Sequence, residues 1–266
     1  MTLPTRTWGQ GPKRALFLHG FTGSRYSFDH LEPLLGDLVR ADVVELPGHH
    51  QSPADFPDFI AVVDAVAAVL EGPTTVLGYS QGARVALALA VRHPHLVERL
   101  VLESGSPGLH RRHDRAVRRR SDEALASLIE AEGVESFIAY WEQLPLFAGL
   151  RALPGDVQAR LRERRVGHDP AGLAAALRSM GQGAQPDLWP ALPTLRVPTL
   201  LLTGAADVKY TRLARRMAAE LPLAWRVAFR GVGHAPHLEV PQAWANEVRA
   251  FLEAPWTHEP RAEDLR

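Results

Sequence analysis

The chain of 266 residues contains no cysteine. This absence excludes a disulfide scaffold, a thiolate zinc site, an iron–sulfur cluster and a cysteine nucleophile. The chain also has no net charge, because 30 basic residues balance 30 acidic ones. A basic field over the whole protein, as expected of a nucleic-acid-binding protein, is therefore lacking.

Long apolar runs are missing too. No stretch approaches the about 18 consecutive apolar residues of a membrane span. Met1 to Lys13 lack the apolar core of a signal peptide, so we expect a cytoplasmic protein without a membrane span. The composition that remains, 46% hydrophobic and 23% charged, is ordinary for a globular chain. The length suits one α/β domain with an insertion, while the oligomeric state is left open.

Short apolar runs recur along the chain, and each is followed by a turn and a helical stretch. Near-continuous apolar strands are typical of a parallel sheet that is buried on both faces. The expected strands are Ala15–His19, Asp42–Leu46, Thr75–Tyr79, Leu100–Glu103, Thr199–Thr203 and Trp225–Phe229. Helical patterns between them cover Phe59–Leu70, Gly82–Arg92, Thr211–Glu220 and Gln242–Leu252. This alternation predicts a doubly wound α/β sheet, with room for little more than one further strand before Ala15.

The stretch from Pro107 to Pro193 interrupts this alternation. It shows no convincing strand but four helical patterns, at Ala116–Glu130, Val134–Glu142, Asp156–Arg165 and Ala171–Gly181. Asp169-Pro170 is typical of a helix N-cap followed by proline at the first helical position. Ligands of open α/β sheets bind at the carboxyl edge of the strands, so we interpret the insertion as a lid over that edge. The predicted division is a core of residues 1–106 and 194–253, a helical lid of residues 107–193, and a polar tail of residues 254–266, whose composition favours disorder.

The strongest motif is Gly78-Tyr79-Ser80-Gln81-Gly82, which follows a predicted strand and opens a predicted helix. This is the context of a nucleophile elbow, a tight turn that exposes a serine. Gly78 and Gly82 are the small residues that such a turn needs. The amide of Gln81, at the helix N-terminus, can donate to an oxyanion. The five-residue pattern also arises by chance, but its position between a strand and an amphipathic helix favours the elbow.

An elbow of the α/β-hydrolase type requires an acid and then a histidine later in the chain. Asp207 follows the fifth predicted strand and His234 follows the sixth. The order Ser80, Asp207, His234 is the required one, and both partners lie in loops at the carboxyl ends of strands. The rivals for the acid and the histidine are Glu103 and His237.

Within such a site, His234 would take the proton of Ser80, and Asp207 would orient the imidazole ring. A second oxyanion donor is expected after the first predicted strand, where the sequence reads His19-Gly20-Phe21-Thr22-Gly23. The Phe21 amide is the expected donor, and Gly20 gives the backbone room. A plain glycine-rich turn is the alternative interpretation of this segment.

Arginines are the candidates for substrate binding. Arg84 lies one helical turn after Ser80, so it either points toward the site or forms an ion pair on the surface. The run Arg111–Arg120 contains six arginines. Without interleaved aromatic residues this run is a poor candidate for nucleic-acid binding. It is either a helix face exposed to solvent or the source of one or two arginines that bind substrate carboxylates. The aromatics further along, which suit a lid core with one member lining the pocket, are Phe137, Tyr140, Trp141 and Phe147.

Taken together, these motifs resemble those of the 2-succinyl-6-hydroxy-2,4-cyclohexadiene-1-carboxylate synthase family of menaquinone biosynthesis. Members of this family are lyases with the α/β-hydrolase fold. The resemblance covers Ala15 to Leu252. Motifs shared with many hydrolases are LHGFTGS (Leu18–Ser24), LPGH (Leu46–His49), GYSQGAR (Gly78–Arg84) and GVGHAPHLEVP (Gly231–Pro241). Motifs particular to the family are LESGSPGL (Leu102–Leu109), RRRSD (Arg118–Asp122), the W-x-x-x-P-L-F pattern of Trp141–Phe147, QPDLW (Gln185–Trp189) and the D-x-K-[FY] pattern of Asp207–Tyr210.

The resemblance implies an α/β-hydrolase fold and elimination of pyruvate from 2-succinyl-5-enolpyruvyl-6-hydroxy-3-cyclohexene-1-carboxylate. Ser80 would be the general base, with Phe21 and Gln81 stabilising negative charge on the succinyl carbonyl. No cofactor and no metal ion are implied, and the partner is a small polycarboxylate substrate. The family's substrate-binding positions fall on Tyr79, Arg84, Arg118 and Trp141, although another arginine of residues 118–120 could take the place of Arg118.

Three positions depart from the family pattern. The elbow has Gln81 where the family usually has methionine or leucine and Ala83 where it has glycine, and Glu45 replaces aspartate. The Gln81 change places a polar group beside the serine, as in some esterases. Two other hypotheses therefore stay open. The first is a serine hydrolase of a carboxylate-bearing ester, thioester or C–C bond, and the second is a non-catalytic ligand receptor, which the intact triad disfavours.

Overall fold

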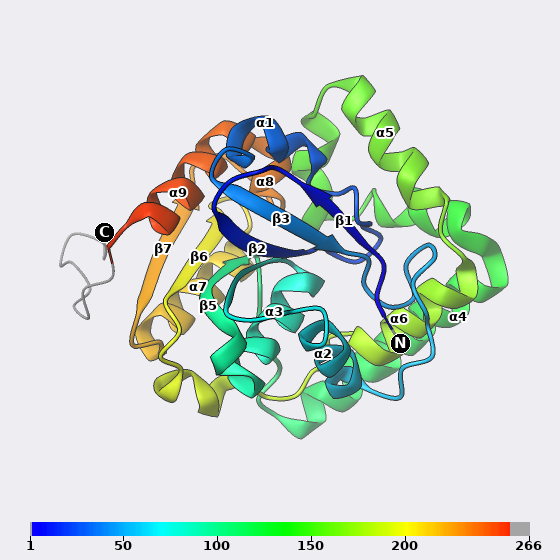
Figure 1. The fold of residues 1–266 in the computed structure, drawn as a ribbon. Helices are drawn as coiled ribbons and strands as arrows, with labels where there is room; N and C mark the ends of the chain where they lie inside the picture. Colours follow the sequence, from blue (N-terminus) through cyan, green and yellow to red (C-terminus); the bar gives the residue numbers. More distant parts are fainter. Residues whose placement is uncertain (1, 256–266) are drawn as a thin grey trace.

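The computed structural model describes residues 2–255 and contains one sheet with the strand order β1-β3-β2-β4-β5-β6-β7 (Figure 1). β1 pairs antiparallel with β3, and the other neighbours pair in parallel. The strands are β1 Thr5–Trp8, β2 Lys13–Leu18, β3 Val39–Val44, β4 Thr74–Tyr79, β5 Val97–Glu103, β6 Thr199–Gly204 and β7 Ala224–Phe229. All six predicted strands are therefore present, and β1 is the one further strand for which the segment before Ala15 has room.

The position of β3 differs from the prediction of Asp42–Leu46. The strand begins at Val39, where it pairs with Lys13 of β2, and ends at Val44, where the chain leaves the ladder. The amide of Glu45 donates to Pro4 O, and the amide of Leu46 donates to His19 Nε2 instead of to a strand. Hydrophobic runs do not reveal such a switch of hydrogen-bond partner.

Helices cover both faces of the sheet. On one face α2 (Phe59–Ala67), α3 (Gln81–Arg92) and α7 (Val208–Glu220) share a hydrophobic cluster with the strands. On the other face the cluster includes α1 (Glu32–Leu35) and α9 (Pro241–Glu253). Side chains of β2 alternate between the clusters, since Leu16 and Leu18 lie in the first and Phe17 in the second. The short elements outside these layers are η1 Asp29–Leu31, η2 Pro94–Leu96 and α8 Pro236–Glu239.

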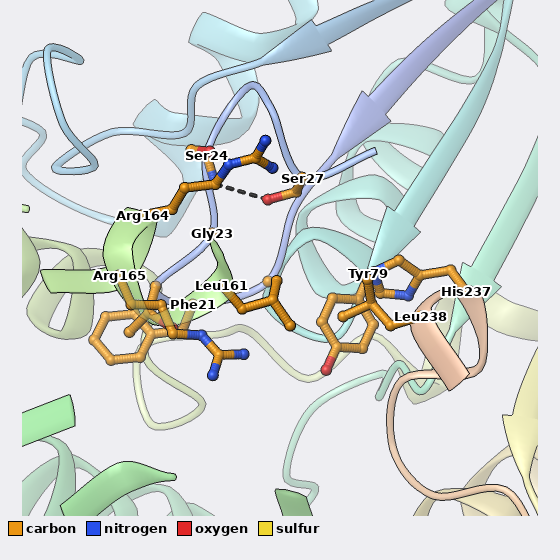
Figure 2. Close-up of a pocket in the computed structure, with 12 residues that line it drawn as sticks. Phe21, Gly23, Ser24, Ser27, Tyr79, Leu161, Arg164, Arg165, His237 and Leu238 are labelled. Atoms are coloured by element: carbon orange, nitrogen blue, oxygen red, sulfur yellow. Dashed lines mark hydrogen bonds between the residues drawn. The ribbon is translucent and has the colours of Figure 1, made fainter. Parts of the chain in front are cut away.

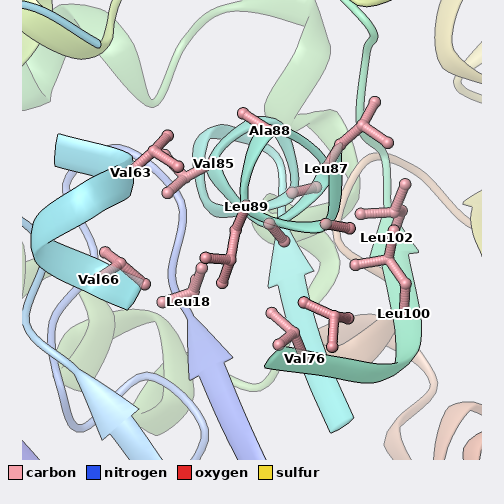
Figure 3. Packing of buried hydrophobic residues seen from close by; sticks show 14 of the residues in the cluster. Leu18, Val63, Val66, Val76, Val85, Leu87, Ala88, Leu89, Leu100 and Leu102 are labelled. Atoms are coloured by element: carbon pink, nitrogen blue, oxygen red, sulfur yellow. The ribbon is translucent and has the colours of Figure 1, made fainter. Parts of the chain in front are cut away.

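The most deeply buried helix is α3, which begins directly after Ser80. Its residues from Gln81 to Ala90 are all buried. Figure 3 shows Leu87 and Leu89 of this helix among side chains of β2, β4, β5 and α2. A helix packed on so many sides fixes the direction of its N-terminus, and with it the position of the residues around Ser80.

Between β5 and β6 the chain forms a helical insertion. Its elements are α4 Arg112–Trp141, η3 Pro145–Ala152, α5 Gly155–Val166, α6 Pro170–Met180 and η4 Trp189–Thr194. A non-helical residue, Gly133, divides α4 into two helices, so the four predicted helical patterns are all present. The 3-10 segments η3 and η4 were not predicted, because such short turns have little periodicity. The Asp169 side chain accepts a hydrogen bond from the Gly172 amide at 2.7 Å, which confirms the predicted N-cap.

The insertion has a small hydrophobic core of its own between α4 and α6, which includes Ile129, Phe137 and Leu173. In Figure 1, α4, α5 and α6 stand together beside the sheet. The exact division at residues 106/107 and 193/194 stays a prediction. The predicted tail, 254–266, lies almost wholly outside the described residues. Within residues 2–255, every helix is too short or too polar to cross a bilayer.

Candidate active site

The turn from β4 into α3 is as tight as the sequence predicts. A Cβ atom on Gly78 would overlap Gly82, and one on Gly82 would overlap Leu18 O, so neither position tolerates a side chain. Ser80 itself has φ 52° and ψ −104°, a conformation that is costly for a residue with a side chain. The amide of Ser80 donates to Glu103 O at 2.8 Å, which ties the turn to the end of β5.

Three side chains from distant parts of the chain meet at this turn. Ser80 Oγ lies 3.0 Å from His234 Nε2, and His234 Nδ1 lies 2.6 Å from Asp207 Oδ2. Asp207 caps α7, and its other oxygen accepts from the Tyr210 amide at 3.2 Å. His234 and Asp207 are both buried. In this geometry the imidazole can take the serine proton, while the carboxylate holds the Nδ1–H tautomer.

The loop that carries His234 is held from both sides. Glu239 accepts hydrogen bonds from the backbone amides of Gly233 at 2.7 Å and Ala235 at 3.1 Å. Ser104 Oγ donates to His234 O at 2.8 Å. These bonds fix the backbone on both sides of His234, and the bond of Nδ1 to Asp207 holds the ring itself toward Ser80.

The rival residues lie close by but pair with each other. Glu103 Oε1 accepts from His237 Nδ1 at 2.8 Å and from the His237 amide at 3.2 Å. Both side chains are buried, and the His237 ring lies 4.6 Å from the Tyr79 ring, between centroids. The structure therefore places Asp207, and not Glu103, against His234.

The predicted oxyanion loop, the segment His19–Gly23 after β2, lies against the elbow. A Cβ atom on Gly20 would be 2.7 Å from the Tyr79 ring and 3.6 Å from Ser80 Cβ, so only glycine allows this approach. The amide of Gln81 is at the first position of α3, where backbone donors have no partner within the helix. Both predicted donors therefore come from segments that adjoin Ser80.

A cavity of about 310 Å³ opens over Ser80 beneath the insertion. Its wall includes every residue that the sequence predicted for substrate binding, together with both residues of the predicted oxyanion site. These are Tyr79, Arg84, Arg118 and Trp141, with Phe21 and Gln81. None of the residues that line this cavity is acidic.

Arg84 is buried, with 9% of its surface exposed, which rules out the alternative of a surface ion pair. Its Nη1 donates to Met180 O, at the end of α6, at 2.7 Å. Burial lowers the pKa of Arg84 to about 10, so the guanidinium keeps its charge at neutral pH.

Arg118 is the member of the arginine run that reaches the cavity. It donates to Asp122 at 2.7 Å and to Gln182 Oε1 at 3.1 Å. Arg119 instead donates to Gly183 O at 3.0 Å, and Arg120 is exposed.

Sequence reasoning missed Lys209 as a cavity residue. Lys209 lines the same cavity as Arg84 and Arg118, and its Nζ lies 5.0 Å from the centre of the Tyr210 ring. Burial lowers its pKa, and the charge of Arg118 adds to this effect. Lysine is rare in this chain, at two residues, and Lys209 lies in the D-x-K-[FY] motif, so a signal was available.

Aromatic residues of the insertion form another part of the cavity wall. Trp141 stacks on Phe137 at 5.3 Å between ring centroids and meets the edge of Phe21 at 5.6 Å. Phe137 is fully buried in the insertion, whereas Tyr140, Trp141 and Phe147 line the cavity. The prediction of one lining aromatic was therefore too low.

A second, small cavity of about 40 Å³ is also lined by Phe21 and Tyr79 (Figure 2). Leu161, Arg164 and Arg165 of α5 cover the oxyanion loop there. Arg164 donates to Tyr26 O at 2.7 Å, and Arg165 donates to Glu142 at 2.9 Å. The bond from Arg164 to Tyr26 O joins the insertion to the segment that follows the Phe21 amide, whereas the bond from Arg165 to Glu142 lies within the insertion.

The chain is similar to proteins of a known family over most of its length. The model of the alpha/beta hydrolase family matches residues 15–247. A 2-succinyl-6-hydroxy-2,4-cyclohexadiene-1-carboxylate synthase from Serratia proteamaculans is 36% identical over 247 residues, which are 90% of this chain and 93% of that protein.

Two solved structures are also similar. MenH from S. aureus has a TM-score of 0.90 and 32% identity, covering 95% of this chain and 98% of its own. An esterase from Thermogutta terrifontis with malate bound has a TM-score of 0.81 and 27% identity, covering 94% and 92%. Because the family model and relatives of over 30% identity span nearly the whole chain, this protein belongs to the alpha/beta hydrolase family and, within it, to the 2-succinyl-6-hydroxy-2,4-cyclohexadiene-1-carboxylate synthases.

Proposed function

We propose that this enzyme eliminates pyruvate from 2-succinyl-5-enolpyruvyl-6-hydroxy-3-cyclohexene-1-carboxylate. The product is 2-succinyl-6-hydroxy-2,4-cyclohexadiene-1-carboxylate. The observation that carries the proposal is the charge of the cavity over Ser80. Three cations, Arg84, Arg118 and Lys209, line it without an acidic residue among the lining side chains. The substrate has three carboxylates, on the ring, the succinyl chain and the enolpyruvyl group.

In the proposed reaction Ser80 acts as the general base. Ser80 Oγ removes the ring proton at C2, next to the succinyl carbonyl, while its own proton passes to His234 Nε2. Asp207 stabilises the imidazolium that forms. The electron pair of the C2–H bond becomes the C2=C3 double bond, and the C3=C4 pair moves to C4=C5. The bond from C5 to the enolpyruvyl oxygen then breaks, and the departing enolate gains a proton to become pyruvate.

The remaining residues of the site stabilise negative charge or contact the substrate ring. The backbone amides of Phe21 and Gln81 donate hydrogen bonds to the succinyl carbonyl oxygen and stabilise the negative charge that develops on it. Tyr79 and Trp141 provide apolar surface for the ring. The step needs no acyl-enzyme, because Ser80 transfers a proton and forms no bond to carbon.

Pyruvate release tests the proposal. The substrate is generated in situ by the preceding pathway enzyme, and pyruvate is followed with a coupled dehydrogenase. The variant Ser80→Ala should release pyruvate at the rate of spontaneous decay, a loss of roughly 10³-fold or more. The control Ser127→Ala, an exposed serine on α4, should retain the wild-type rate. Equal rates for wild type and Ser80→Ala would reject the proposal.

A second candidate is hydrolysis of an anionic ester. It is favoured by the distance of 3.0 Å between Ser80 and His234 and by the similarity to an esterase at TM-score 0.81. Formation of an acyl-serine from a small ester, detected by mass spectrometry, together with absence of pyruvate release, would favour the hydrolase.

A further inference from the structure

The proposed reaction includes a proton transfer that the triad does not supply directly. When the bond from C5 to the enolpyruvyl oxygen breaks, that oxygen keeps the electron pair and needs a proton. The proton that Ser80 gives up goes to His234 Nε2, which faces Ser80 Oγ at 3.0 Å. Ser80 works at C2, and C5 is the ring carbon opposite C2. A second acid beside C5 would therefore complete the step.

Few of the groups that line the cavity are suited to give up a proton. Guanidinium groups hold their protons in proteins, so Arg84 and Arg118 bind charge but do not act as acids. Burial raises the pKa of Tyr210 and holds that of Tyr79 well above its usual range, which makes both phenols weaker acids. Among the lining residues the one ammonium group belongs to Lys209.

Lys209 lies beside the triad, at the opening of the cavity. It is in the first turn of α7, two residues after Asp207, and its Nζ lies 5.0 Å from the centre of the Tyr210 ring. The same ring lies 4.7 Å from the His234 ring, between centroids. Arg84 is buried, whereas Lys209 is exposed and still lines the cavity, so its side chain borders both the cavity and the solvent. A leaving group has to depart on that side.

The ammonium group is also free to act on a ligand. Arg118 donates to Asp122 at 2.7 Å, whereas Lys209 Nζ has no carboxylate or carbonyl partner among residues 2–255. Partial burial lowers the pKa of Lys209, and the charges of Arg118 and Arg84 add to this effect against the opposing charge of Asp207. An acid with a lowered pKa gives up its proton more readily at neutral pH.

We propose that Lys209 is the general acid that protonates the leaving group. This inference rests on the proposed function and names the proton donor of its last step. As the C5–O bond breaks, one N–H bond of the ammonium group breaks and an O–H bond forms on the departing enolpyruvate, which tautomerises to pyruvate. Lys209 is left neutral and His234 protonated. Uptake of one proton from solvent by Lys209 and release of one by His234 then restore both residues.

The variant Lys209→Arg tests this role, because it keeps the positive charge but removes the proton that can be transferred. It should lower the kcat of pyruvate release about 10²-fold, while KM changes less than about threefold because the charge is still present. The control Lys13→Arg changes the other lysine of the chain, at the start of β2 and outside the cavity, and should keep wild-type kinetics. Pyruvate is measured in quenched samples, and the rate of spontaneous substrate decay is subtracted.

The pH profile and chemical rescue give two further measurements. In the wild type, kcat should fall as pH rises through the pKa of Lys209, because the neutral amine has lost the proton it would donate. Lys209→Arg should lack this fall. Lys209→Ala, which also serves if the arginine variant does not fold, should regain activity with added ethylammonium ions and not with guanidinium ions.

A kcat of Lys209→Arg within about twofold of the wild type would overturn the inference, as would a rise in KM alone. An unchanged alkaline fall in that variant, or equal rescue of Lys209→Ala by both ions, would contradict it as well. Lys209 would then only bind a carboxylate, and the proton would come from His234, Tyr140 or water. Failure of the proposed function has a different signature, because the wild type would then release pyruvate no faster than Ser80→Ala.

Discussion

At the scale of single residues, the site depends on which carboxylate meets which histidine. Two buried pairs lie within one region, Asp207 with His234 and Glu103 with His237. Only the first contacts Ser80, through the His234 ring. The second supports the Tyr79 ring and leaves Glu103 Oε2 without a partner among the described residues. A carboxylate–histidine pair therefore occurs twice in this region. Asp207 and His234 contact the candidate nucleophile, whereas Glu103 and His237 pack against the Tyr79 ring.

The matched variants Asp207→Asn and Glu103→Gln separate these positions. Asp207→Asn should lower the kcat of pyruvate release by roughly 10³- to 10⁴-fold, because an amide does not stabilise the imidazolium or hold its tautomer. Glu103→Gln should lower kcat by less than about tenfold, since its carboxamide can still accept from His237. Steady-state pyruvate assays give both values. A larger loss in Glu103→Gln than in Asp207→Asn would show that the pairs have been assigned to the wrong roles.

At the scale of elements, the insertion depends on a break in α4. Gly133 has φ 80° and ψ 167°, a region that residues with side chains rarely adopt. The break lets the second half of α4 turn, so that Phe137 and Trp141 face the oxyanion loop through contacts with Phe21. One glycine therefore decides the direction of the aromatic wall of the cavity.

Gly133→Ala should destabilise the protein by about 1–3 kcal/mol, the usual cost of forcing a side chain into this backbone region. A Cβ atom at Gly133 would meet no atom within 4 Å, so steric overlap does not contribute. Gly155 is equally open but lies in α5 with an ordinary φ, so Gly155→Ala should be neutral or stabilising by up to about 1 kcal/mol. Urea unfolding compares the two variants, and equal free energies of unfolding would contradict the backbone argument.

At the scale of the whole molecule, a group of histidines joins three segments around the oxyanion loop. The His19 and His49 rings lie 4.8 Å apart, and the His49 and His168 rings 5.3 Å apart. His168, from the insertion, donates through Nε2 to Thr22 O at 3.1 Å and accepts from the His50 amide at 3.1 Å. Burial lowers the pKa of His19 to about 3 and that of His168 to about 2, and it holds the pKa of His49 well below its usual range.

The folded protein should therefore lose stability in acid. At pH 7.5, about one unit above the ordinary histidine pKa of about 6.5, these histidines are largely neutral in both the folded and the unfolded state, so protonation costs little stability. Below pH 6.5 the unfolded chain binds protons that the folded chain does not bind. The free energy of unfolding should then fall by up to about 1.4 kcal/mol per pH unit for each histidine, until pH approaches the folded pKa values. Urea unfolding at pH 7.5, 6.0 and 5.0 measures this slope.

In the variant His168→Gln the free energy of unfolding should fall less steeply with decreasing pH, by up to about 1.4 kcal/mol per pH unit. This difference in slope does not depend on the stability of the variant at pH 7.5. His113→Gln, on the exposed start of α4, should keep the wild-type slope. Identical slopes in all three proteins would mean that His168 does not cause the acid sensitivity.

The sequence by itself determined the local features. The alternation of strands and helices, the elbow at Ser80 and the cap at Asp169 depend on residues that are neighbours in the chain, and the order of serine, acid and histidine is read along it. Apolar periodicity, glycine spacing and turn chemistry report such features directly. The resemblance in motifs then identified Arg84, Arg118 and Trp141 as candidates before their positions in space were known.

Only the tertiary structure decided which distant groups meet. His234 pairs with Asp207, 27 positions away, and His237 with Glu103, 134 positions away, because strand order places the ends of β5, β6 and β7 together. The approach of Lys209 to the arginines arises in the same way. Such contacts depend on packing between layers, and no pattern along the chain encodes the distance between two side chains that the fold brings together.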